Sequence, residues 1–434
     1  MPHPLPFRRA LTVAAATSLL PWGTSQAADL LLDPTLTIVL DGIYYDDNAN
    51  GEGDALLGET AGIFNAYDHD ADHDAAGHEH GLEQGFNLRH TEISLTGGIE
   101  TLFDARLNAA VYDGGDVEVE EAFLATTGLP AGLRVKAGKF YSGIGYANER
   151  HPHDWDFVDQ NLPYRTLLGV HGLSDTGAQL TWKPAWDHDT RFGIEAFQGD
   201  NNERLGTEAD HADDLPGRDD APRLWTAFAK WSPDLGHDHA LQLGASAAFF
   251  RSHQEFHHHG EPDEHGLDGE ARLWGLDATY AFDADGTHGQ GDWRVAAEYL
   301  TAEKNLEVAH HASNPGVIGQ ARDFTEDGFY VQATYGIAPH WEIGLRYDAV
   351  GFTNEKRGPL AGVNADYDES DRWTAAATWH ISDSSRLRAQ VARASVALET
   401  GREHYTQFYL QYQWRFSLGE RSDPHAGHHH GHDH

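Results

Sequence analysis

The feature that most constrains this fold is an alternating stretch near the end of the chain, between Phe408 and Phe416. On an extended strand, one face would hold Phe408, Leu410, Tyr412, Trp414 and Phe416, and the other Tyr409, Gln411, Gln413 and Arg415. An apolar, aromatic face opposite a polar face is typical of a membrane β-barrel strand, because one face contacts lipid and the other a water-filled lumen. A soluble sandwich edge can show the same alternation once, so its recurrence decides the class.

The pattern recurs along the whole chain. Sixteen stretches have strand-like alternation or composition: 36–46, 89–97, 101–112, 116–126, 132–141, 175–183, 190–199, 223–232, 239–250, 271–282, 292–302, 327–336, 340–351, 372–381, 386–396 and 404–416. Most have about ten residues, the length that a tilted strand needs to cross the hydrocarbon layer. The sequence therefore predicts an all-β fold: a transmembrane antiparallel β-barrel of about 16 strands.

One predicted strand breaks its own alternation. Val117, Val119 and Glu121 have the same parity, so a regular strand would turn Glu121 toward lipid. A charged side chain is costly there. We therefore expect a β-bulge or a shorter membrane span at this point.

The connections between the predicted strands alternate in length. The short ones are 97–100, 127–131, 184–189, 233–238, 283–291, 337–339 and 382–385, and the long ones include 47–88, 142–174, 200–222, 251–270, 302–326 and 352–371. Short periplasmic turns and long external loops are the rule in bacterial outer-membrane barrels. Two short external connections, 113–115 and 399–403, are exceptions. The alternation supports a barrel with long external loops.

The two ends of the chain are predicted to lie outside the barrel. Residues 1–27 read as a signal peptide, with Arg8 and Arg9, an apolar run from Ala10 to Leu20, and a small-residue cleavage site ending at Ala27. The apolar run is too short to span a bilayer. This leaves residues 28–416 for the barrel and 417–434 for a His-rich periplasmic tail. We expect the protein in the bacterial outer membrane, with lipid and the barrel-assembly machinery, through the C-terminal strand, as partners.

Composition limits the binding partners. Asp and Glu number 69 against 30 Lys and Arg, a formal net charge of −39, which argues against nucleic-acid partners and favours the attraction of cations. The chain has no Cys, so a thiolate zinc site is excluded. It also contains no G-x-S-x-G, H-E-x-x-H or P-loop motif, and we predict no enzymatic activity.

Three segments resemble the phosphate-selective porin family, the O/P type of outer-membrane porin. They are 116–124 (DVEVEEAFL), 133–140 (LRVKAGKF) and the loop that continues to Gly169-Val170. The resemblance implies a sixteen-stranded channel, often trimeric, in which residues 142–174 fold into the barrel as a constriction loop. We accordingly expect a homotrimer.

The acidic composition departs from that family, which captures anions with rows of Lys and Arg. Basic candidates for the lumen are nevertheless present: Arg106, Arg134, Lys136, Arg346, Arg388 and Arg415. A local anion path therefore stays open as an alternative.

The 30 His residues are concentrated outside the predicted strands. With their acidic neighbours, the candidate metal ligands are His69, Asp70, Asp72, His73, Asp74, His78, Glu79 and His80; His257, His258, His259, Glu261 and His265; His310 and His311; and, in the tail, His425, His428, His429, His430, His432 and His434. Imidazole and carboxylate together bind Zn²⁺, Ni²⁺ or Cu²⁺ where no thiolate is present. A plainer interpretation is that acidic, His-containing loops are solvated surface.

The predicted constriction loop has its own set of candidates: Glu149, His151, His153, Asp154, Asp156 and Asp159. Folded inward, they would place metal ligands and negative charge at the narrowest point of the pore, where charge sets selectivity. Alternatively, they pair with lumen arginines and pin the loop.

The sequence thus predicts a diffusion channel that favours cations and assists the uptake of divalent transition metal, zinc first, with no obligatory cofactor. The alternatives are an anion or phosphate porin with incidental histidines, and a closed barrel that binds metal at the surface without conducting.

Overall fold

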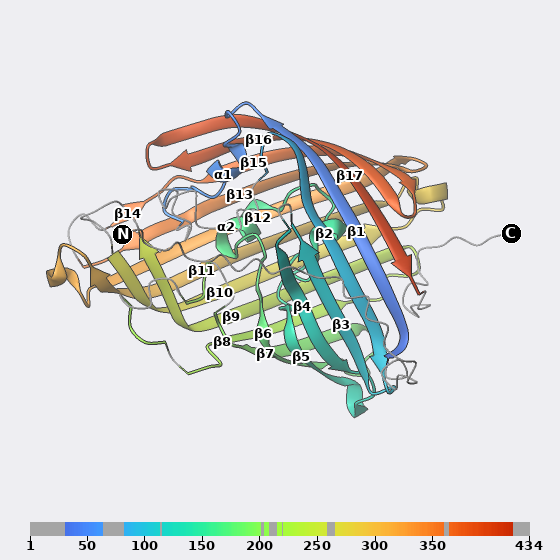
Figure 1. The fold of residues 1–434 in the computed structure, drawn as a ribbon, viewed down its shortest axis with the longest axis horizontal. Coiled ribbons are helices and arrows are strands. Elements are labelled where there is room, and N and C mark those ends of the chain that lie inside the picture. The colour runs from blue at the N-terminus through green and yellow to red at the C-terminus, as the bar shows by residue number, and fades with distance from the viewer. Residues whose placement is uncertain are drawn as a thin grey trace, which may run out of the picture.

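The alternating segments form one antiparallel sheet of 17 strands that closes on itself (Figure 1). This computed structural model describes residues 31–63, 82–112, 115–200, 204–207, 215–218, 220–257, 265–359 and 364–419. The strands are β1 (Leu31–Asp47), β2 (Gly85–Ile99), β3 (Phe103–Val111), β4 (Val117–Thr126), β5 (Leu133–Tyr141), β6 (Ser174–Trp182), β7 (Asp189–Phe197), β8 (Leu224–Ser232), β9 (His239–His257), β10 (His265–Phe282), β11 (Trp293–His311), β12 (Ala321–Ala338), β13 (Trp341–Arg357), β14 (Ala365–Asp366), β15 (Ser370–Ser382), β16 (Ser385–Leu398) and β17 (Gly401–Leu418).

Pairing of the first and last strands closes the barrel. β1 pairs with β2 on one side and with β17 on the other, with Leu40 opposite Trp414 and Tyr44 opposite Leu410. β14 has two residues and pairs with the end of β13, while β13 continues its own ladder with β15. Sixteen strands therefore make the wall, and the predicted fold class and strand number are confirmed.

In the described part of the chain, helical structure is confined to connections. The helices are α1 (Gly53–Leu56) and α2 (Leu162–Leu167), and the 3₁₀ turns are η1 (Pro130–Gly132), η2 (Pro152–Asp154), η3 (Thr287–Gly289) and η4 (Pro315–Val317). Within the described ranges, no helix has the length and apolarity needed to cross a membrane.

The strands on one side of the barrel are longer than the sequence predicted. β9 to β13 have 17–19 residues each, whereas β3 to β8 have nine or ten. Much of the predicted loops 251–270, 302–326 and 352–371 is therefore strand. The hydrocarbon layer sets only a minimum strand length. Beyond it, polar strands keep their ladder bonds in water, so composition alone did not reveal where these strands end.

Exposed aromatic side chains mark both edges of the lipid-facing surface. Near the short turns lie Trp231, Trp293, Trp341, Trp379 and Trp414, and toward the long loops lie Trp225, Trp274 and Trp373. The rings of Trp341 and Trp379, opposite each other on β13 and β15, stack with centroids 5.8 Å apart. Aromatic girdles of this kind flank the apolar band of outer-membrane barrels.

The lipid-facing surface gives a first testable prediction. Leu345 on β13 is 60% exposed, and it lies between Trp341 and Tyr347 along the strand. We expect Leu345→Arg to lower the free energy of unfolding by about 2–4 kcal/mol, the cost of Arg near the bilayer midplane. Denaturant-induced unfolding in lipid bilayers would measure this.

Leu418 is the matched control, because it is 53% exposed but is the last residue of β17, beyond Trp414 and Phe416. Leu418→Arg is expected to cost about 0–1 kcal/mol, as near an interface. Equal effects at the two positions would contradict the assignment of Leu345 to the lipid-facing band.

Candidate functional site

The connection from β5 to β6, residues 142–173, folds into the barrel as predicted, and we call it the constriction loop. Its backbone is held from different parts of the wall. Arg89 of β2 donates from Nη1 to the carbonyl oxygen of Val158 (2.7 Å), and the amide of Val158 donates to Oε1 of Gln390 of β16 (2.8 Å). Side chains of the wall thus satisfy backbone groups that would otherwise be buried without partners.

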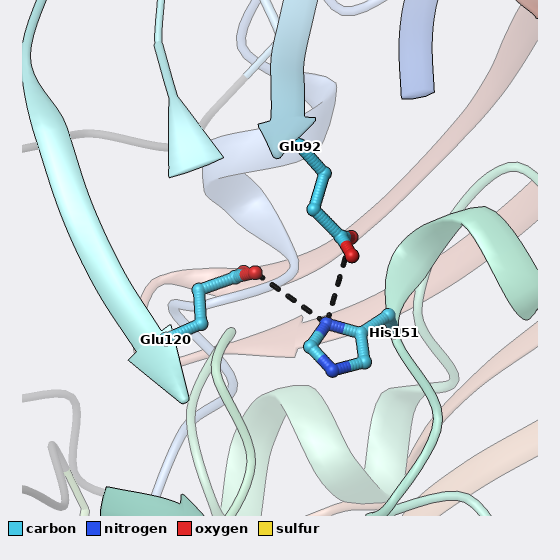
Figure 2. A group of neighbouring side chains, drawn as sticks. All are labelled: Glu92, Glu120 and His151. Atoms are coloured by element: carbon cyan, nitrogen blue, oxygen red, sulfur yellow. Dashed lines mark ion pairs between the residues drawn. The ribbon is translucent and has the colours of Figure 1, made fainter. Parts of the chain in front are cut away.

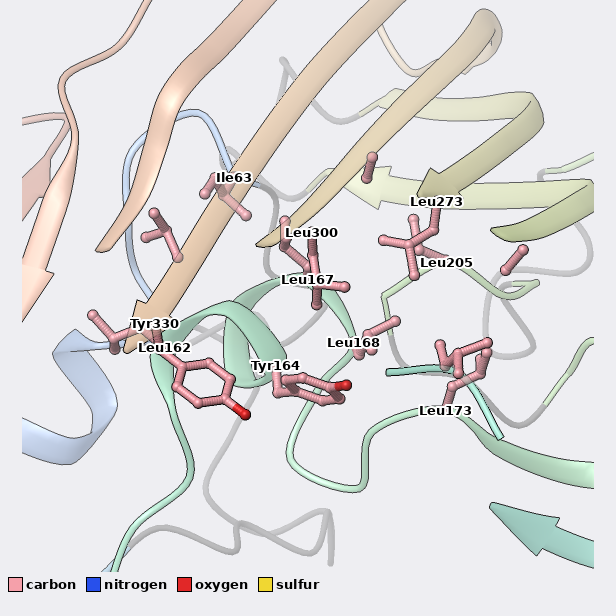
Figure 3. Close-up of a cluster of buried hydrophobic side chains, with 14 of the residues drawn as sticks. Ile63, Leu162, Tyr164, Leu167, Leu168, Leu173, Leu205, Leu273, Leu300 and Tyr330 are labelled. Atoms are coloured by element: carbon pink, nitrogen blue, oxygen red, sulfur yellow. The ribbon is translucent and has the colours of Figure 1, made fainter. Parts of the chain in front are cut away.

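Helix α2 anchors the second half of the loop. Asn161 caps it by accepting a hydrogen bond from the amide of Tyr164 (3.0 Å). Figure 3 shows Leu162, Tyr164, Leu167 and Leu168 of this segment among apolar side chains of the wall, including Leu300 and Tyr330. The core of the protein therefore lies inside the barrel, between loop and wall.

A buried carboxylate, Glu298, holds part of the first half of the loop. Glu298 of β11 accepts hydrogen bonds from the amides of Tyr146 and Ala147, both at 2.8 Å. It also accepts from the hydroxyl groups of Tyr164 (3.0 Å) and Tyr330 (2.5 Å). Four donors on one carboxylate fix this part of the loop against β11 and β12.

Among the predicted constriction acids, Asp159 is paired with the wall. Its carboxylate lies 2.8 Å from Arg346 and 2.6 Å from Arg372, and it accepts from Nε2 of Gln390 at 2.7 Å. Burial raises the pKa of Asp159, but Arg346 and Arg372 more than offset this, and the pKa falls to about 2. Asp159 is therefore ionised, and two guanidinium groups balance its charge.

Asp156 and Glu149 are paired in the same way. Asp156 lies 2.5 Å from Arg294 and accepts from Nε2 of Gln332 at 2.7 Å. Glu149 lies 3.3 Å from Arg191 and 3.5 Å from Lys230. Of the two interpretations of the loop acids, pinning to basic residues of the wall describes these positions.

The six predicted pore-lining bases lie on β3, β5, β13, β16 and β17. Arg106 lies 3.4 Å from Glu121, and Arg134 lies 3.4 Å from Asp104. Lys136 lies over the rings of Phe123 and Phe140, and Arg346 contacts Asp159 and Asp348. Arg388 donates to the carbonyl oxygen of Trp155, and Arg415 is exposed near the short-turn end of β17. Most of these cations therefore already have partners in the wall or the loop.

The irregular strand β4 has the bulge that its alternation predicted. Asn108 of β3 pairs with Glu121 and Ala109 pairs with Val119, so Glu120 is the additional residue. A bulge lets two successive side chains escape the strict alternation of a strand. Glu120 and Glu121 are both buried, each 5% exposed, and both approach His151 of the constriction loop.

His151 lies among carboxylates. Its Nε2 lies 3.1 Å from Oε2 of Glu121, and its Nδ1 lies 3.4 Å from Oε2 of Glu120 and 3.6 Å from Oε2 of Glu92 of β2. Figure 2 shows Glu92 and Glu120 pointing toward the ring from two strands. Burial lowers the pKa of His151, but the three carboxylates outweigh it and raise the pKa to about 10.

His153 extends this cluster. Its ring stacks on that of His151, with centroids 5.7 Å apart, and its Nδ1 lies 2.7 Å from Oε2 of Glu92. Its Nε2 lies 3.3 Å from Asp154, whose side chain is half exposed. The predicted residues His151, His153 and Asp154 thus come together on the β2–β4 side of the lumen.

Four predicted metal ligands outside the loop are also described. His257, His265 and His311 are directly opposite one another on β9, β10 and β11. The rings of His257 and His265 stack at 4.8 Å, and those of His265 and His311 at 5.8 Å. The fourth, His310, contacts Phe256. The structure therefore aligns three histidines in one row. The row lies at the end of the barrel where the long connections are, which we call the long-loop end.

The remaining predicted ligands lie outside the described residues. They are His69, Asp70, Asp72, His73, Asp74, His78, Glu79, His80, His258, His259 and Glu261, and His425, His428, His429, His430, His432 and His434 of the tail. The signal-peptide prediction for residues 1–27 also lies outside them. These assignments stay predictions.

Sequence reasoning missed several residues that hold the site together. Glu92, Glu120 and Glu298 supply its carboxylates, and Arg294 and Arg372 pair with the loop acids. Arg372, for example, alternates with Trp373 in a predicted strand and lies on the same face as Thr374 and Ala376. The sequence therefore indicated that its side chain faces the lumen. The sequence did not indicate that Arg372 pairs with Asp159, because the two residues are far apart along the chain.

With the geometry established, the chain can be compared with known proteins. No family model matches the chain. A protein of Aquifex aeolicus (strain VF5), described as uncharacterized, is 29% identical over 353 residues, which cover 79% of this chain and 71% of that one.

Among solved structures, the outer membrane channel DcaP of Acinetobacter baumannii matches with a TM-score of 0.52 and 12% identity, covering 88% of this chain and 96% of its own. An anion-selective porin from Comamonas acidovorans matches with a TM-score of 0.52 and 10% identity, covering 88% and 99%. A loop L8 deletion mutant of OmpT, an outer membrane protein of Vibrio cholerae, matches with a TM-score of 0.50 and 12% identity, covering 88% and 98%.

At these identities the likeness shows the fold alone. The chain has the closed barrel of outer-membrane porins, and its place is the bacterial outer membrane, as predicted. The likeness does not extend to the ion that any of these proteins conducts.

The pairing of Asp159 gives a second prediction. Asp159→Asn would leave the buried guanidinium groups of Arg346 and Arg372 with less negative charge, since Asp348 is then the one carboxylate among the described residues within ion-pair distance of them. We expect the free energy of unfolding to fall by up to about 3–5 kcal/mol, the cost of breaking a buried ion pair. Urea unfolding in micelles would measure this.

Asp366→Asn is the matched control, because Asp366 pairs with Arg357 but its side chain is 76% exposed, and an exposed pair contributes about 1 kcal/mol or less. The pH dependence checks the cause. Because the pKa of Asp159 is lowered in the folded state, its contribution is fully present above its unfolded pKa of about 3.9 and is lost as the pH falls through about 2. A difference between wild type and Asp159→Asn that stays constant down to pH 2 would contradict the ion-pair explanation.

Proposed function

We propose that the protein is an outer-membrane diffusion channel that favours cations and assists the uptake of divalent transition metal, with zinc as the first candidate. The observation that carries this proposal is a closed barrel whose long-loop end is rich in carboxylates and histidines. The barrel supplies the path, and the ligands near its entrance raise the local concentration of the ion.

The charge at the long-loop end supports the cation preference. Among the described residues, exposed carboxylates there include Asp46, Glu303, Glu307, Asp323, Asp366, Asp368, Glu369, Glu399 and Glu403, and the exposed bases are Arg251, Arg393 and Arg402. An excess of one sign at a pore mouth concentrates ions of the other sign. The lumen itself contributes less to this preference, because Glu149, Asp156 and Asp159 are paired with bases.

The histidines support the metal preference. The row formed by His257, His265 and His311 places three imidazole rings side by side at the long-loop end. His-rich tracts at 69–80 and 425–434 would add further ligands. Many weak sites that exchange ions quickly suit capture and release better than one tight site.

A second candidate is an anion channel, and one observation favours it. Arg386 and Arg388 of β16 donate to the carbonyl oxygens of His153 and Trp155. Among the described residues, no carboxylate lies within ion-pair distance of either guanidinium group. Two cations balanced by neutral groups would attract an anion, in keeping with the resemblance to phosphate-selective porins.

Conductance of the purified protein tests the proposal. In a planar bilayer with a KCl gradient, we expect discrete steps and a reversal potential of the sign for cations. An anion-selective reversal potential that Arg386→Gln/Arg388→Gln diminishes would favour the second candidate instead. A folded barrel that gives no conductance steps would contradict both the cation channel and the anion channel. The remaining hypothesis would be a closed barrel that binds metal at its surface without conducting. Native mass spectrometry of the same sample would test the predicted homotrimer.

Metal capture is tested by growth. Replacing the His and Asp residues at 68–80 with Asn and Ser should slow growth in zinc-depleted medium if these side chains raise local zinc, and should have no effect in zinc-replete medium. The matched control replaces a similar number of exposed carboxylates at the short turns, including Asp187, Asp234, Asp285 and Asp383, with Asn, and should not slow growth. Equal growth of the first variant and wild type in depleted medium would show that these histidines are incidental.

A further inference from the structure

Three side chains in the lumen are arranged as the ligands of a metal ion. Nδ1 of His151 lies 3.6 Å from Oε2 of Glu92 and 3.4 Å from Oε2 of Glu120, and one atom from each residue lies within 4.8 Å of the others. Ligands about 2.0–2.1 Å from a tetrahedral Zn²⁺ are separated by roughly 3.3–3.4 Å. The spacing therefore fits a common cation better than direct hydrogen bonds.

Oε2 of Glu92 accepts a hydrogen bond from Nδ1 of His153 (2.7 Å), but the other two atoms lack a hydrogen-bond partner. Nδ1 of His151 and Oε2 of Glu120 are buried, and neither has a hydrogen-bond partner. His151 is 3% exposed and Glu92 is 2% exposed. Buried polar atoms without partners are costly, and a shared cation would satisfy both at once.

The opposite side of the ring is arranged as it is in known metal sites. Nε2 of His151 faces Oε2 of Glu121 at 3.1 Å, with the amide of Asn108 also at 3.1 Å. A histidine that ligates a metal usually donates its other ring N–H to a carboxylate, which fixes the ring and raises its basicity. Glu121 can take this part, and Nδ1 is then left for the metal.

The ligands come from three separate segments, and each is fixed in place. Glu92 belongs to β2, Glu120 is the bulged residue of β4, and His151 belongs to the constriction loop. Glu120 also lines a cavity in the lumen, together with Arg89, His90 and Tyr141. The cavity therefore reaches one of the three ligands, Glu120.

We propose that Glu92, Glu120 and His151 bind one divalent transition-metal ion of the Zn²⁺ class, which fastens the constriction loop to β2 and β4. This site deepens the proposed function, on which its physiological role rests. Its existence can be tested separately, because binding does not require conduction. The competing explanation is that a charged imidazole alone holds the loop through ion pairs with the three glutamates.

Zinc binding to the full-length protein separates these explanations. A chelator that buffers free Zn²⁺ at a low level would leave weak surface sites unfilled, and bound zinc is then measured after equilibrium dialysis. We expect Glu92→Gln/Glu120→Gln to lose one zinc per chain. Glu195→Gln is the matched control, because Glu195 is a buried lumen carboxylate that accepts from the amide of Gly143 of the same loop, at 3.0 Å. This control should keep the zinc.

A second variant tests the orientation of the ring. Glu121→Gln keeps all three ligands, so it should still bind zinc but about 10–100-fold more weakly, the usual cost of removing the carboxylate behind a ligating histidine. X-ray absorption of the bound zinc should show one imidazole and oxygen ligands in wild type. Heat-modifiable migration in gels verifies that each variant is folded.

Equal zinc content in wild type and folded Glu92→Gln/Glu120→Gln would overturn the site and favour the charged imidazole. That result would leave the proposed channel untouched if cation-selective steps are recorded. Conversely, loss of one zinc from a barrel that does not conduct would support the site and contradict the channel.

Discussion

Closure of the sheet is the constraint on which the rest of this structure depends. In hydrocarbon no water can satisfy a free strand edge, so β1 must pair with both β2 and β17. Closure fixes which residues of every strand face lipid and which face the lumen. It also creates an interior that a loop can enter only if the wall offers partners for the loop's backbone and charges. Glu298, Gln390 and Arg346 are such partners.

The constriction loop therefore carries its charge into the barrel in a balanced form. Asp159 meets Arg346 and Arg372, Asp156 meets Arg294, and Glu149 meets Arg191 and Lys230. The net charge of −39 consequently says little about the narrowest part of the lumen. It describes the long-loop end far better, where carboxylates are exposed. The composition of this chain therefore predicts the charge at the entrance of the barrel rather than the charge at the constriction loop.

The most informative signal in the sequence was strand parity, the alternation of apolar and polar residues at odd and even positions of a strand. What it could not predict has physical reasons. Parity predicted the lipid face of β17, the number of strands in the wall, and an irregularity at Glu121, which is the bulge at Glu120. It did not predict where β9 to β13 end, because polar strands pair equally well beyond the membrane. Nor did it single out Glu92: this residue is readable as facing the lumen, but its partner His151 approaches from a loop that parity does not describe.

The cluster around His151 is one place where the charges of the lumen are not balanced. Glu92, Glu120 and Glu121 face the ring of His151, and Glu92 also lies 2.7 Å from His153. Even with both rings charged and Arg106 3.4 Å from Glu121, these three carboxylates together with Asp154 exceed the bases by one charge. His153 and Asp154 pair with each other and offset one another. Everywhere else in the loop a base of the wall meets each acid. A buried excess of carboxylate is costly without a cation, so the bulge that brings Glu120 inward makes physical sense if a cation arrives to share it.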